Sequence, residues 1–144
     1  MPERKVSKTS RKGQQAPIDT SFGHLQPQAI DIEKVVLGAL MIDKDAFTVV
    51  SEIIKPETFY EARHQKIYEA VQSLNLQEKP VDIMTVTEEL RHKGTLEDVG
   101  GPAYVVELSS QVASSAHIEY HAHILAQKFL ARQLIQFASM IETD

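Results

Sequence analysis

The 144-residue chain contains no cysteine, which excludes disulfide bridges, a thiol nucleophile, and zinc or iron–sulfur sites that depend on cysteine ligands. No apolar run approaches the roughly 18 residues of a membrane span, and the basic N-terminus lacks the apolar segment of a secretory signal. Aromatic residues make up only 6%, whereas apolar residues reach 42% and charged residues 24%. These proportions are typical of a globular domain, and we expect a soluble, cytoplasmic protein.

Motifs for nucleotide or hydrolytic chemistry are missing as well. The sequence has no GxxxxGK[ST] phosphate-binding loop, no GxSxG nucleophile elbow and no HExxH zinc motif. The glycines between Gly94 and Gly101 lack a suitably placed lysine and follow a predicted helix rather than a strand. We therefore predict no catalytic, cofactor-binding or metal-binding residue in this chain.

The net charge of −5 is unevenly distributed. Residues 1–20 carry a net charge of +3, and the remainder of the chain carries −8. Residues 1–24 are polar and have little to bury, so we interpret them as a flexible basic tail. The acidic body, residues 25–144, is poorly suited to bind DNA phosphates. Nucleic-acid binding by the tail stays open as an alternative.

Apolar spacing in the body predicts helices and no strand of useful length. The predicted helices span residues 29–41, 44–54, 61–74, 83–93, 102–111 and 116–143. Asp43 is a candidate N-cap. For the fourth helix, Thr85 and Glu88 have capping-box spacing, Asp82 is an equally good cap, and Gly94 is placed to end the helix. Gly38 costs its helix about 1 kcal/mol relative to alanine, which predicts a close approach of another helix there. We expect an all-α fold, a compact bundle of about five helices followed by one long helix.

The long predicted helix carries two apolar stripes when it is projected at about 100° per residue. The first contains Ile118, Leu125, Phe129 and Met140. The second contains Leu130, Leu134, Phe137 and Ile141, spaced i, i+4, i+7 and i+11. One stripe suffices to pack the helix on the bundle, so the second needs a cover from a following helix or another subunit. The acidic residues at the end of the helix oppose its dipole, and we expect the natural protein to continue beyond Asp144.

The histidines and paired carboxylates give weaker signals. His117 and His121 are four residues apart and could face one metal, but zinc needs three or four converging ligands. We interpret them as hydrophilic helix residues, and His64 as a packed residue rather than a catalytic one. Adjacent helical residues diverge by about 100°, so Glu88 and Glu89 form no acid–base pair, and we expect both to be solvated.

Several short stretches follow one another in a distinctive order. They are 36–43 (VLGALMID), Phe59–Tyr60 with His64 and Ile67–Tyr68, 81–94 (VDIMTVTEELRHKG), Leu96 with 99–104 (VGGPAY), Glu107–Leu108 and 114–120 (SSAHIEY). No single stretch is diagnostic, but the ordered series resembles the N-terminal domain of bacterial replicative DNA helicases of the DnaB family. The resemblance covers the chain from about Pro27 to its end.

This resemblance implies a small helical bundle followed by a helical hairpin, of which residues 116–143 would form the first helix. In the family, hairpins pair neighbouring subunits, and the N-terminal domains form a collar of dimers on a hexameric ring that recruits primase. ATP and Mg²⁺ would be bound by a separate motor domain, and DNA by the ring of the parent protein. A helicase loader is a further partner to consider.

The function implied for this chain is therefore non-catalytic assembly and primase recruitment, with the second stripe as the candidate interface. Two alternatives remain from the residues alone. One is a stand-alone helical adaptor or regulator that shares this domain. The other is a metal- or nucleic-acid-binding regulator that uses the histidines or the basic tail.

Overall fold

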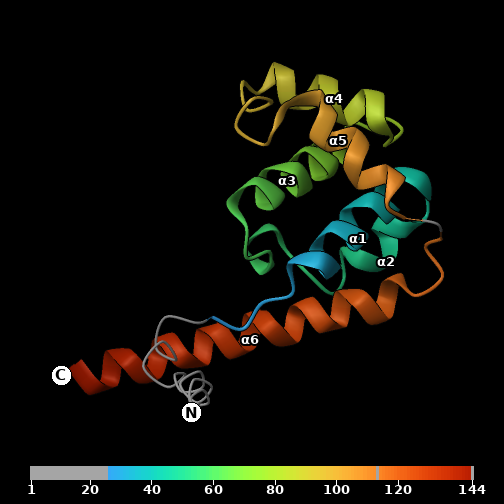
Figure 1. Ribbon diagram of the computed structural model, residues 1–144. Helices are drawn as coiled ribbons and strands as arrows, with labels where there is room; N and C mark the ends of the chain where they lie inside the picture. The colour runs from blue at the N-terminus through green and yellow to red at the C-terminus, as the bar shows by residue number, and fades with distance from the viewer. Residues whose placement is uncertain (1–25, 113, 144) are drawn as a thin grey trace, which may run out of the picture.

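The computed structural model describes residues 26–112 and 114–143, so the predicted tail over residues 1–24 lies outside the described part. Every regular element in that part is helical, which confirms the predicted all-α fold (Figure 1). The elements are α1 (Ile30–Ile42), α2 (Ala46–Val50), the 3-10 turn η3 (Pro56–Thr58), α3 (Ala62–Leu76), α4 (Ile83–His92), α5 (Gly101–Ser110) and α6 (Ile118–Thr143). None of these helices combines the length and apolar character needed to cross a membrane.

Local hydrogen bonds explain why α4 begins and ends where the sequence predicts. Asp82 Oδ1 accepts a hydrogen bond from the Thr85 N–H at 2.9 Å, and Thr85 Oγ1 accepts one from the Asp82 N–H at 2.9 Å. This reciprocal pair is a capping box. At the other end, Gly94 adopts φ +77°. Its N–H and that of the next residue bond to carbonyls of the last helical turn at 3.0 Å each, as in a Schellman motif.

The predicted helix over residues 44–54 is too long. Helix α2 covers only Ala46–Val50, and residues 51–53 form turns. Pro56 restricts the preceding Lys55 to extended backbone, at φ −125° and ψ 171°, but this affects only that residue and does not account for the end of α2 at Val50. Asp43 does not occupy the N-cap position, which belongs to Asp45. Its carboxylate instead accepts the Asp45 N–H at 2.9 Å in the turn that precedes the helix.

Helix α1 is the centre of the bundle and packs against α2, α3, α5 and α6. Its buried face contributes Val36, Leu37 and Leu40 to one continuous hydrophobic core. At Gly38, a Cβ atom would lie 2.2 Å from the carbonyl oxygen of Leu108 in α5. The predicted close helix approach at this glycine is therefore confirmed.

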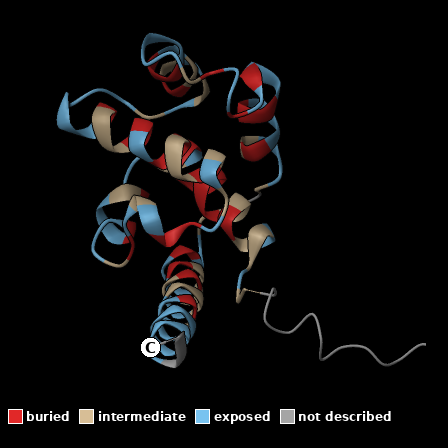
Figure 2. Cartoon of the chain, turned by 90° about the vertical axis from the view of Figure 1, so that its left-hand side faces the viewer, coloured by how far each residue is buried: buried red, intermediate tan, exposed pale blue. Residues whose placement is uncertain are grey.

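We call the bundle formed by α1–α5 the head. Helix α6 runs beside α1 and α2 and then projects beyond the head (Figure 1). Before it, the Ser114 hydroxyl accepts the Ala116 N–H at 3.0 Å, and Ser115 Oγ donates to Asp43 Oδ2 at 2.5 Å. Figure 2 looks along the helix and shows buried residues near the head and exposed ones toward the C-terminus. The last buried residue of α6 is Arg132, and residues 133–141 are all exposed. We call residues 133–143 the arm.

Candidate protein-interaction surface

The second predicted stripe of α6 is exposed along its whole length. Leu130, Leu134, Phe137 and Ile141 retain 56%, 59%, 61% and 57% of their accessible surface. Their alternating spacing of four and three residues is that of a coiled-coil contact line, in which side chains insert between those of a partner helix. Large apolar side chains gathered on one helix face are characteristic of protein interaction surfaces. The structure thus brings the four predicted site residues together on one accessible surface.

The first predicted stripe is only partly buried. Ile118 and Leu125 lie in the core, and Phe129 is half-buried. Met140, predicted on the same stripe, is 66% exposed, so the expectation that it packs on the bundle is wrong. The physical reason is length, because Met140 lies eight residues beyond Arg132, the last buried residue of α6.

A buried polar network joins three helices of the head. His64 in α3 is 0% exposed and Glu33 in α1 is 1% exposed. His64 Nδ1 lies 2.6 Å from Glu33 Oε1, and His64 Nε2 lies 2.6 Å from the hydroxyl of Tyr104 in α5. The predicted packing role of His64 is therefore confirmed. Sequence reasoning placed Glu33 only at the helix N-terminus and missed its burial, although it shares a face with Val36 and Leu37.

This network has the residue types of a proton relay but not the access that catalysis needs. With a proton on Nδ1, His64 donates to the Glu33 carboxylate and accepts the Tyr104 hydroxyl hydrogen bond at Nε2, so each group is satisfied. Burial also raises the pKa of Tyr104 to about 12, which keeps its hydroxyl protonated. The hollow between α3 and α4 and the smaller one beside Met41 and Ile83 are not lined by any of the three side chains, all of which are buried or nearly so. The arrangement therefore links α1, α3 and α5 structurally.

The histidines at the start of α6 do not form a metal centre in the described part of the chain. His117 and His121 have ring centroids 6.4 Å apart in an edge-to-face arrangement. His123 Nε2 lies 4.0 Å from Glu119 Oε2. Among the residues that the structure describes, no group of three or more His, Cys, Asp or Glu residues is placed to hold a metal ion.

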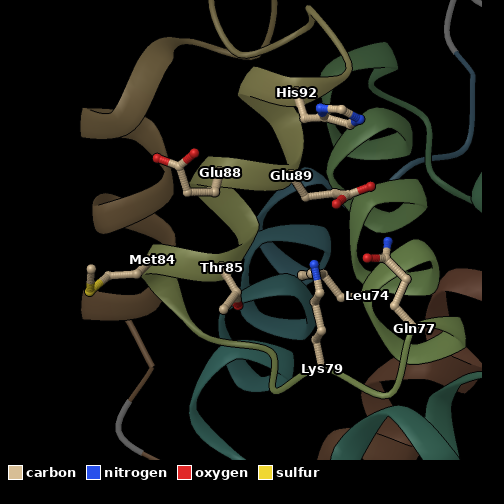
Figure 3. Close-up of a pocket in the computed structure, with 8 residues that line it drawn as sticks. All are labelled: Leu74, Gln77, Lys79, Met84, Thr85, Glu88, Glu89 and His92. Carbon is tan, nitrogen blue, oxygen red and sulfur yellow. The ribbon is translucent and has the colours of Figure 1, made fainter.

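A hollow of about 680 Å³ lies between α3 and α4 (Figure 3). Glu88 and Glu89 line it and diverge as predicted, but the expectation that both are solvated is wrong. Glu89 is 8% exposed and accepts a hydrogen bond from Ser73 Oγ at 2.7 Å, whereas Glu88 is exposed and pairs with Arg91. The hydrogen bond from Ser73 lowers the pKa of Glu89, so this carboxylate stays ionised and ties α4 to α3.

Comparison with known proteins confirms the resemblance seen in the sequence. Residues 25–127 match the family described as DnaB-like helicase N terminal domain. The replicative DNA helicase DnaB of Rhodothermus marinus is 47% identical over 112 residues, which cover 78% of this chain and 12% of that helicase. The replicative DNA helicase DnaC of Bacillus subtilis is 42% identical over 120 residues, which cover 83% of this chain and 26% of that helicase.

Solved structures give the same result. The N-terminal domain of DnaB helicase from Mycobacterium tuberculosis superposes with a TM-score of 0.81 at 35% identity and covers 83% of both chains. A DnaB-like replicative helicase, whose reported structure includes its interactions with primase, superposes with a TM-score of 0.69 at 27% identity. That match covers 80% of this chain and 27% of the other. The present chain thus spans about a quarter or less of the helicases compared here.

Proposed function

The chain belongs to the family of DnaB-like helicase N-terminal domains, and from this premise we propose that it serves assembly and primase recruitment in a replicative DNA helicase. In this proposal the parent protein is a hexameric, ATP-dependent helicase that unwinds duplex DNA at the replication fork. ATP and Mg²⁺ would bind a motor domain, because the present sequence has no phosphate-binding loop. The chain itself would act through its surfaces.

The observation that carries the proposal is the exposed second stripe of α6. We assign it to contact with a second copy of this chain, with α6 as the first helix of a helical hairpin. A surface that pairs with its own copy about a two-fold axis contributes every side chain twice. The alternative occupant is a helix that follows α6 in the parent protein. A stand-alone adaptor is not favoured, because the relatives compared above are replicative helicases.

The strength of such a contact follows from the exposed area. Full burial of a Leu, Ile or Phe side chain is worth about 1.5–3 kcal/mol. The four stripe residues are a little over half exposed, so covering each one gains about 1–2 kcal/mol. A pair of copies would gain this for eight side chains, against an association cost of about 4–15 kcal/mol. We therefore expect the 144-residue chain to self-associate weakly, with a dissociation constant in roughly the micromolar to millimolar range.

Sedimentation velocity over a concentration series tests this assignment. Leu134→Asp and Phe137→Asp place a charge in the contact and should weaken self-association at least tenfold, while circular dichroism of the head stays unchanged. Gln133→Asp and Gln136→Asp are matched controls, because they add the same charge at exposed positions on the arm outside the stripe. Unchanged association of the stripe variants would remove the stripe from the dimer contact and favour the following helix as its cover.

Primase recruitment needs its own test. The chain, immobilised through its N-terminus, should bind purified bacterial primase reversibly in surface plasmon resonance. Absence of binding, with the chain folded and self-associating normally, would confine the function of this chain to assembly.

A further inference from the structure

Residues 58–61, where η3 leads into α3, are held by two side chains of opposite charge. Glu33 Oε2 accepts the Tyr60 N–H at 2.5 Å, and Glu33 Oε1 accepts the Glu61 N–H at 3.4 Å. Arg132 Nη2 donates to the Thr58 carbonyl at 2.8 Å. A carboxylate therefore holds two N–H groups of this segment, and a guanidinium holds one of its carbonyls.

Arg132 is an unusual buried cation. It is 8% exposed, and the charge of Glu33 acts on it without a direct hydrogen bond between the two groups among the described contacts. Its guanidinium donates to two backbone carbonyls, those of Thr58 and Pro27, both at 2.8 Å. It also lies near the rings of Tyr60 and Phe129, with 5.3 and 5.6 Å to the centroids. A buried guanidinium that donates to backbone carbonyls of two remote segments fixes geometry, because its N–H groups bond in fixed directions.

Arg132 lies at the base of the exposed arm of α6, so its contacts affect the direction of the arm. Arg132 is the last buried residue of the helix, and the exposed arm begins at the next residue. Helix α6 continues for eleven residues after Arg132 and ends at Thr143, which corresponds to about 16 Å at 1.5 Å per residue. A tilt of about 10° at Arg132 would displace the tip of the arm by roughly 3 Å, enough to break the packing of a helix pair.

We propose that Glu33 and Arg132 are positioning residues that clamp residues 58–61 between them and thereby set the direction in which the arm leaves the head. The proposal rests on the proposed function in one respect, namely that the arm carries the contact surface for a second copy. The clamp would present the stripe in one orientation before association, so that little freedom is lost when two copies meet. The buried His64 and Tyr104 hold Glu33 in the orientation that the clamp uses.

Distances between spin labels on the head and the arm test the clamp directly. The chain has no native cysteine, so Lys93→Cys and Gln136→Cys provide two unique labelling sites, both exposed. Double electron–electron resonance is measured with a large excess of unlabelled chain, so that only distances within one chain contribute. We expect a narrow distribution of label-to-label distances in the otherwise unsubstituted chain. Its width should at least double in Arg132→Gln and in Glu33→Gln.

Two further variants make the result specific. Arg132→Lys keeps the charge but cannot reach both carbonyls with fixed geometry, so its distribution should be intermediate. Arg91→Gln is the matched control, because it removes an exposed arginine on α4 that pairs only with Glu88, and it should leave the width unchanged. An unchanged distribution in Arg132→Gln, with the head folded, would overturn the proposal. Loss of the folded head in both Arg132 variants would also overturn it, because these contacts would then sustain the core.

The spin-label result is independent of self-association. If the stripe variants leave sedimentation unchanged but Arg132→Gln broadens the distance distribution, the clamp stands and the proposed dimer contact fails. If the distribution is unchanged while the stripe variants dissociate the dimer, the contact stands and the clamp fails. Where both hold, Arg132→Gln should also weaken self-association at least tenfold without altering any stripe residue.

Discussion

Replacing Gly38 with alanine should destabilise the protein, although alanine is the better helix former by about 1 kcal/mol. The added Cβ would lie 2.2 Å from the Leu108 carbonyl oxygen and 2.5 Å from Val112 Cγ2. Favourable carbon contacts need about 3.5–4.0 Å, so α5 must retreat from α1 by more than 1 Å at this point. The side chain of Val112 can adjust, but the carbonyl of Leu108 belongs to a helix and cannot turn away.

The magnitude follows from these opposing effects. Overpacking a well-filled core costs about 1–3 kcal/mol and occasionally more, and displacement of α5 also loosens Leu108 and Tyr104, which are buried on it. A contact of 2.2 Å belongs to the upper end of this range. After subtraction of the gain of about 1 kcal/mol in helix propensity, we expect Gly38→Ala to lower the free energy of unfolding by about 2 kcal/mol or more. Urea denaturation followed by circular dichroism at equilibrium measures this difference.

Two variants separate the clash from other effects of alanine. Gly94→Ala has no atom within 4 Å of the added Cβ, but its backbone is left-handed at φ +77°, so it should cost only about 1–2 kcal/mol. Val112→Ala in the Gly38→Ala background removes the side-chain part of the clash and leaves the carbonyl part, so the rescue should be partial. If Gly38→Ala is as stable as the unsubstituted chain or more stable, the conclusion that this glycine is needed for close helix packing is refuted.

Three further predictions concern other elements. Glu78 follows α3 with φ +58°, and this left-handed backbone costs a residue with a side chain about 1–2 kcal/mol. Because glycine also loses more conformational freedom on folding, Glu78→Gly should raise the free energy of unfolding by about 0.5–1 kcal/mol in urea titrations. A lower free energy of unfolding would contradict this. Burial raises the pKa of Tyr68 to about 12, so stability should fall as pH rises from about 10 to 12. Tyr68→Phe should flatten that fall in urea midpoints measured at pH 9, 10 and 11, and an unchanged slope would count against the assignment. Hydrogen bonds from the Ser115 hydroxyl and the Asp45 N–H lower the pKa of Asp43 in the folded chain. The ionised Asp43 therefore stabilises the fold fully above its unfolded-state pKa, and this stabilisation is lost as pH falls through its folded-state pKa. Thermal melts between pH 3 and 6 bracket the usual aspartate pKa of about 3.9. Over this range the melting temperature of Asp43→Asn should fall less than that of the unsubstituted chain, and an equal fall would refute the assignment.

The accuracy of the sequence predictions follows the range of the interactions involved. The boundaries of α4 were predictable because the capping box at Asp82 and the glycine stop at Gly94 act within a few residues. Helix α2 was predicted too long because apolar residues continue through Ile54 in a stretch that is not helical. Their backbone N–H groups bond within turns, and apolar spacing does not distinguish such turns from a continuing helix.

The buried polar contacts depend on residues distant in sequence, and composition does not reveal them. Glu33 meets His64, and His64 meets Tyr104, only after three helices have packed. A local signal nevertheless existed, since Glu33 lies three and four residues before Val36 and Leu37 on the buried face of α1. Arg132 likewise lies seven residues after the buried Leu125 and three after Phe129. A charged residue in register with an apolar face is thus a sequence marker for a buried charge, and its partner emerges only from the tertiary structure.

The two stripes of α6 show what periodicity can and cannot predict. Projection of the helix correctly placed Leu130, Leu134, Phe137 and Ile141 on one face, because that depends only on the 3.6-residue turn. It could not predict that the other stripe would be buried at Leu125 and exposed at Met140, because that depends on where the head ends rather than on α6 itself. Beyond Arg132 both stripes are accessible, so a partner that covers the arm has a wider apolar surface available than the second stripe alone. Asp substitution at Met140 should therefore also weaken self-association if the partner wraps around the arm, and should leave it unchanged if the contact is confined to the second stripe.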